Sequence, residues 1–124
     1  MKEAKHISPF IDLANVPKAK LMKGVETQIL TGLNGGKIMM VLTEVLPDHE
    51  VPLHSHPHEQ IGMVQSGKAL FKIGAEERIV KKGDLYCIPS SVSHHVKCLG
   101  RESFVVLEVF CPIREDYLQK IKTS

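Results

Sequence analysis

The sequence lacks an apolar run of the ~18 residues that a membrane-spanning helix needs, so we expect no membrane partner. It also lacks a basic stripe: 16 lysines and arginines are scattered among 14 acidic residues. We therefore expect no nucleic-acid partner. The N-terminus has no apolar segment of the kind that marks a secretion signal, which favours a cytoplasmic location.

Cysteine is scarce as well. The only three are Cys87, Cys98 and Cys111, an odd number without a Cys-x-x-Cys spacing. This count argues against a disulfide framework and against a cysteine zinc site. We predict buried, reduced thiols, as in a cytoplasmic protein.

Helical periodicity is almost absent. Short apolar runs recur between turn signals, roughly every ten residues, and predict an all-β sandwich or barrel. The predicted strands span residues 10–13, 25–30, 37–46, 51–64 with a bend at Pro57, 69–73, 77–80, 85–88, 92–99 and 102–110.

Length and the C-terminal pattern complete the expected organisation. A chain of 124 residues predicts one domain, which we place at residues 23–124. Residues 1–22 form an expected N-terminal arm that packs on the barrel or on a partner. Residues 114–121 predict a short helix with Leu118 and Ile121 on one side.

The segment Val51–Gly62 contains three of the seven histidines within five positions. In an extended strand His54 and His56 point the same way, whereas Pro57 bends the chain. Neighbouring imidazoles are poor core packing and natural metal ligands, so the segment predicts a metal site. The alternative is a solvated, histidine-rich loop.

Two motifs here resemble those of the cupin superfamily. His54-Ser55-His56 is followed by Gln60 after three residues and by Gly67 after six more; downstream, Gly83 and Pro89 precede His94. Adjacent strand residues face opposite ways, so only one of His94 and His95 can reach the site, and the resemblance implies that it is His94. The resemblance implies a double-stranded β-helix (jelly-roll) barrel with a short C-terminal helix, and a divalent metal held by His54, His56, Gln60 and His94.

The sequence departs from the general cupin pattern at four positions. Asp48 and Ser91 stand where the motifs have glycine, and Cys98 replaces the closing asparagine. The change at Ser91 concerns the geometry of a turn. Gln60 replaces a glutamate and leaves the ligand shell neutral, so a divalent ion keeps its full charge and acts as a stronger Lewis acid.

The ending of the chain narrows the resemblance. Residues 107–118 are similar to the ending of pectin-degradation cupins of the KdgF type, which share this form of the first motif, and the match spans roughly residues 23–118. It implies ring opening and ketonisation of 4,5-unsaturated uronic acid monomers from pectin or alginate. The matching catalytic positions are Glu108, where the family has aspartate, Phe110 and Arg114.

These residue types suit that chemistry. The metal, which could be Zn, Ni, Mn, Fe or Co, can stabilise negative charge. Glu108 can move a proton, and Arg114 can bind the carboxylate of a sugar acid through two parallel hydrogen bonds. The alternatives are an ion-paired Glu108, an Arg114 that is only surface charge, and a Phe110 that is only core. His58 and His95 are expected in supporting or surface roles.

Two other functions stay open. Three histidines on a metal with free positions would also suit an oxygenase or isomerase that acts on another small acid. A non-catalytic protein could use the barrel mouth to bind a small ligand.

The strand predicted at residues 102–110 is apolar on both faces. One face carries Phe104, Val106, Glu108 and Phe110, and the other carries Val105, Leu107 and Val109. A barrel needs no apolar exterior unless something covers it, so we predict a homodimer in which this strand packs near the partner.

Overall fold

The structure, a computed structural model, describes residues 8–33 and 35–123, so His6 and the start of the expected arm lie outside it. The described residues form ten strands, a 3₁₀ turn at Leu13–Asn15 and one helix. The strands are β1 (Ala19–Met22), β2 (Val25–Ile29), β3 (Met39–Val45), β4 (Glu50–His54), β5 (Glu59–Ser66), β6 (Lys68–Ile73), β7 (Glu76–Lys81), β8 (Leu85–Ile88), β9 (His94–Leu99) and β10 (Phe104–Cys111), and the helix is α1 (Glu115–Thr123).

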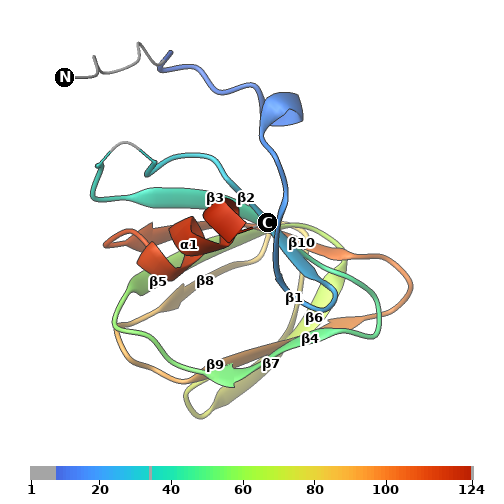
Figure 1. Cartoon of the computed structure of the whole chain (residues 1–124). Helices are drawn as coiled ribbons and strands as arrows, with labels where there is room; N and C mark the ends of the chain where they lie inside the picture. The colour runs from blue at the N-terminus through green and yellow to red at the C-terminus, as the bar shows by residue number, and fades with distance from the viewer. Residues whose placement is uncertain (1–7, 34, 124) are drawn as a thin grey trace, which may run out of the picture.

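The strands form two sheets that face one another (Figure 1). The larger has the order β1-β2-β3-β10-β5-β8, and the smaller has the order β4-β9-β6-β7. Every pair is antiparallel. The predicted all-β jelly roll with a short C-terminal helix is therefore confirmed.

Alternating side chains explain how the sheets close on a core. Along β10, Phe104, Val106, Glu108 and Phe110 are buried, while the intervening residues are half-buried. β3 alternates in the same way and pairs antiparallel with β2. Apolar side chains from both sheets fill the space between them, as expected for two sheets that pack face to face.

Helix α1 packs on inward-facing residues at one end of the larger sheet. Ile113, Tyr117, Leu118 and Ile121 contact a cluster of Ile29, Met39, Val41 and Phe110. The predicted apolar side of this helix, with Leu118 and Ile121, is confirmed. No helix among the described residues is long and apolar enough to cross a membrane.

The strand predicted at residues 10–13 is wrong. Phe10 is exposed, and the carboxylate of Asp12 accepts a hydrogen bond from the Ala14 amide, which starts the 3₁₀ turn at Leu13. A side chain that bonds the backbone two residues ahead competes with strand pairing. The first strand is instead β1 (Ala19–Met22), which lies at the edge of the larger sheet.

The prediction of buried thiols holds only for Cys98. Cys87 and Cys111 are exposed, and all three cysteines are free. Cys87 faces outward because it alternates with the inward-facing Tyr86 and Ile88 of β8.

The two motif positions without glycine adopt the backbone conformation that glycine favours. Asp48 has φ 64° and Ser91 has φ 65°, both in the left-handed region. The departure from the motif at Ser91 therefore concerns backbone geometry, as predicted. The Ser91 amide donates to the carbonyl of His56 and ties the second motif to the first.

Candidate metal centre and active site

The two motifs bring three histidines together. His54 ends β4 and His94 begins β9, where the two are register partners, and His56 follows in the connection to β5. One ring nitrogen from each lies within 4.8 Å of the others. His56 lies two residues past the end of β4, immediately before the bend at Pro57 and His58.

Backbone carbonyls orient all three imidazoles. Nδ1 of His54 lies 2.8 Å from the Pro52 oxygen, Nδ1 of His56 lies 3.0 Å from the His58 oxygen, and Nδ1 of His94 lies 2.9 Å from the Val92 oxygen. A carbonyl only accepts, so each Nδ1 carries the proton and each Nε2 keeps its lone pair. This arrangement is typical of histidines that bind a metal through Nε2.

The donor atoms at the centre fit a cation. Nε2 of His94 is buried and has no hydrogen-bond partner within the described part of the chain. Nε2 of His56 lies 3.0 Å from Oε1 of Gln60, so two lone pairs face one another. A cation bound between these atoms would satisfy their lone pairs. Without one, the buried lone pairs would have no compensating partner.

The larger sheet supplies the remaining polar groups. Gln60 lies beside Phe110 on one row of inward-facing residues, and on the next row Glu108, Gly62 and Tyr86 are neighbours on β10, β5 and β8. Oε2 of Glu108 accepts hydrogen bonds from Nε2 of Gln60 and from the hydroxyl of Tyr86. A glutamate at position 60 would turn a second carboxylate toward Glu108, which explains why glutamine fits here.

Burial sets the proton affinities of these groups. It raises the pKa of Glu108, although Tyr86 and Gln60 oppose the rise by hydrogen bonding to the carboxylate. Burial also raises the pKa of Tyr86 well above its usual value, so its hydroxyl remains a donor. Burial lowers the pKa of His56 and brings the pKa of His94 down to about 4, which keeps these imidazoles neutral.

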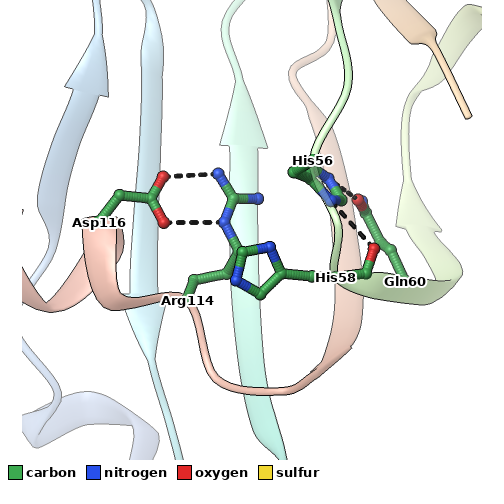
Figure 2. A network of polar contacts seen from close by, with 5 residues as sticks. All are labelled: His56, His58, Gln60, Arg114 and Asp116. Atoms are coloured by element: carbon green, nitrogen blue, oxygen red, sulfur yellow. Dashed lines mark hydrogen bonds and ion pairs between the residues drawn. The ribbon is translucent and has the colours of Figure 1, made fainter. Parts of the chain in front are cut away.

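Arg114 is buried at the start of α1 and is not a surface charge. Its Nε and Nη2 donate to the carboxylate of Asp116 at 2.9 and 2.7 Å, as the paired dashed lines in Figure 2 show. The guanidinium carbon lies 5.0 Å from the Phe110 ring centroid and 4.2 Å from that of Tyr117. Asp116 and the two rings therefore fix the guanidinium while other N–H groups stay available to a ligand.

A cavity of about 290 Å³ adjoins the centre. Of the predicted site residues, His54, Gln60, His94, Glu108 and Arg114 line it. His56 contributes to the histidine cluster behind it, and Phe110 is buried against His56 at 5.8 Å between ring centroids.

The other two histidines of the motifs lie outside the cluster. His95 faces the opposite side of β9, with its Nε2 2.7 Å from the Glu50 carboxylate. His58 contributes its carbonyl to His56, and its ring lies 5.4 Å from the His56 ring (Figure 2).

Sequence reasoning did not single out Tyr86 or Asp116. Asp116 lies two residues beyond Arg114, and this spacing was the available signal. Tyr86 offers no local signal, because its contact with Glu108 depends on the register of three strands.

Comparison with known proteins agrees with this geometry. Residues 41–110 match the model of the cupin domain. The chain is 33% identical over 110 residues to a pectin degradation protein, KdgF, of Dickeya dadantii (strain 3937), an alignment that covers 88% of this chain and 96% of that protein.

Solved structures share the fold. KdgF from Halomonas sp. has a TM-score of 0.79 at 23% identity, with 90% of this chain and 99% of that chain covered. An RmlC-like cupin from Shewanella frigidimarina NCIMB 400 has a TM-score of 0.77 at 22% identity, with 94% and 99% covered. The chain belongs to the cupin family, and within that family it is similar over most of its length to KdgF.

Proposed function

We propose that this protein is a metal-dependent cupin that opens and ketonises 4,5-unsaturated uronic acid monomers. The observation that carries the proposal is the convergence of three histidine ring nitrogens beside a cavity lined by a buried acid and a buried arginine. The identity to KdgF over most of the chain supports pectin or alginate monomers as the substrate class. His54, His56, Gln60 and His94 are the proposed ligands.

The reaction is an isomerisation. The anomeric hydroxyl loses its proton and becomes an aldehyde as the bond between the anomeric carbon and the ring oxygen breaks. The ring oxygen keeps the bonding electrons, and the resulting enolate gains a proton at C4 to become a ketone. A bound divalent ion would supply Lewis-acid stabilisation of the negative charge on the substrate oxygens. Zn, Ni, Mn, Fe and Co all suit imidazole and amide ligands.

Each protein group has a separate task. Arg114, held by Asp116, binds the substrate carboxylate through its remaining N–H groups. Glu108 holds and moves the proton: Gln60 and Tyr86 orient its carboxylate through Oε2, beside the cavity. Phe110 packs its ring against the Arg114 guanidinium.

The direct test is loss of the ultraviolet absorbance of the 4,5 double bond. Purified protein loaded with Zn²⁺, Ni²⁺ or Mn²⁺ is expected to speed this loss over buffer that contains the same metal. Glu108→Gln should lower the rate about 100-fold or more, since it removes general acid–base catalysis. A wild-type protein that gives no acceleration with any of these metals would contradict the proposal.

A second candidate, binding of a small acid without turnover, is favoured by the engagement of Glu108. Gln60 and Tyr86 both hold its carboxylate, and an acid that stays paired moves no proton. Calorimetric binding of the uronate without any change in its absorbance would support this candidate over the enzyme.

We also propose that the chain is a cytoplasmic homodimer. The three free cysteines fit a reducing compartment. The outer face of β5, β8 and β10 carries exposed Ile61, Met63 and Leu85, together with half-buried Leu107 and Val109. An apolar patch of this kind on a sheet marks a contact surface, and a second copy of the chain offers a matching one.

A further inference from the structure

One row of the larger sheet places a tyrosine beside the site. Glu108, Gly62 and Tyr86 are register neighbours on β10, β5 and β8. Gly62 has no side chain, and the ring of Tyr86 occupies the space above it: a Cβ at position 62 would fall far inside van der Waals contact with the tyrosine Cζ and hydroxyl oxygen. Tyr86 can therefore extend across β5 to Glu108 only because its neighbour is glycine.

The ring of Tyr86 is fixed at both ends. Its centroid lies 4.5 Å from that of the buried Phe71, and its hydroxyl donates to Oε2 of Glu108. The same oxygen accepts from Nε2 of Gln60. Two donors from two strands thus hold a buried carboxylate, which gives that carboxylate one orientation.

The carboxylate in turn decides which way the Gln60 amide faces. An ionised carboxylate only accepts hydrogen bonds, so the NH₂ group of Gln60 must point to Glu108. The amide oxygen then points to Nε2 of His56, 3.0 Å away, where the histidine nitrogens gather. If the amide turned over, its oxygen would face the carboxylate and its NH₂ group would face the ligand atoms.

We infer that Tyr86 is a positioning residue of the metal centre: it holds Glu108, and Glu108 orients Gln60 so that the amide oxygen is offered to the cation. The inference rests on the proposed metal-dependent function. It assigns Tyr86 and Gly62 a joint role, since the glycine makes room for the tyrosine.

The test combines a metal-free measurement with a metal titration. In the metal-free protein, the side-chain ¹H–¹⁵N signal of Gln60, identified by its loss in Gln60→Met, is expected to shift in Tyr86→Phe. Outer-shell partners of a metal ligand typically contribute 10–100-fold in affinity, so Tyr86→Phe should bind Co²⁺ about tenfold more weakly, with an altered visible Co²⁺ spectrum.

Gly62→Ala is a second way to remove the contact between Tyr86 and Glu108. The added methyl group displaces Tyr86 without removing its hydroxyl and should reproduce both changes. Gly36→Ala is the matched control, because its added Cβ would have its nearest neighbour 3.9 Å away and should leave both readouts as in the wild type. The melting temperature of each metal-free variant shows independently whether that variant is folded.

An unchanged Gln60 signal, or Co²⁺ affinity within twofold of wild type in a folded Tyr86→Phe, would overturn the inference. A loss of melting temperature alone would show that Tyr86 only packs. A wild-type protein that binds no Co²⁺ would instead contradict the proposed function, and the amide signal alone would then decide whether Tyr86 orients Gln60.

Discussion

At the scale of single residues, the site depends on imidazoles that stay neutral. Burial lowers the pKa of His94 from 6.5 to about 4, so the unfolded chain binds a proton between these values that the folded chain does not. Stability conferred by the neutral imidazole is therefore complete above pH 6.5 and is lost as the pH falls toward 4. The raised pKa of Glu108 acts in the opposite sense, since stability from its bound proton is lost as the pH rises above 4.5.

The contribution of His94 can be isolated by substitution. In the presence of a chelator, urea unfolding of wild type and His94→Gln between pH 7 and pH 5 should show a steeper loss of stability in the wild type, by about 1–2 kcal/mol. Glu108 is present in both proteins, so its own titration contributes to both pH dependences. Equal pH slopes would show that His94 is not desolvated as the geometry indicates.

At the scale of elements, the connections between strands hold the motifs in register. The loop after β8 is tied to the loop after β4 in two places: the Ser91 amide donates to the His56 carbonyl, and the Ser90 hydroxyl donates to the Pro57 carbonyl at 2.6 Å. Ser91 makes its contact with φ 65°, a conformation that costs a residue with a side chain roughly 1–2 kcal/mol.

Glycine at this position should relieve that cost. We expect Ser91→Gly to stabilise the protein by about 0.5–1 kcal/mol, because the gain in the folded state exceeds the added freedom of the unfolded chain. Ser91→Val should destabilise it, since a β-branched residue tolerates positive φ worse than serine does. Urea unfolding midpoints measure both. A destabilised Ser91→Gly would indicate that the serine hydroxyl matters more than the backbone conformation.

The sequence predicted what local patterns encode. Alternation along β10 identified the inward face with Glu108 and Phe110, and the histidine spacing located the cluster. Two features escaped, one because a side-chain cap overrode a strand-like pattern and the other because its cause is not local. Residues 10–13 look like a strand until the Asp12 side chain caps a turn, and Tyr86 joins the site through the pairing of β5 with β8.

At the scale of the whole molecule, the proposed homodimer depends on the outer face of the larger sheet. Its apolar residues lie on three adjacent strands, so one substitution at the centre of the patch should weaken the contact between the two copies. Leu107→Lys places a charge there, and an unpaired buried charge costs about 3 kcal/mol or more, equivalent to ~100-fold or more in dimer affinity.

Light scattering after size-exclusion chromatography would detect the change from dimer to monomer. Leu33→Lys is the matched control, because Leu33 is an exposed leucine in the connection between β2 and β3, away from this face. A Leu107→Lys protein that remains dimeric would place the interface elsewhere, and a monomeric wild type would remove the dimer proposal.

The donors of the centre come from both layers of the barrel: His54 and His94 from the smaller sheet, and Gln60 from the larger. An ion coordinated by all of them would cross-link the two sheets. Its occupancy and the resistance of the barrel to heat would then be coupled, with a gain of about 2.7 kcal/mol when free ion exceeds its dissociation constant a hundredfold. The availability of the ion in the cell would thereby set how long each copy of the protein survives, as well as whether it works.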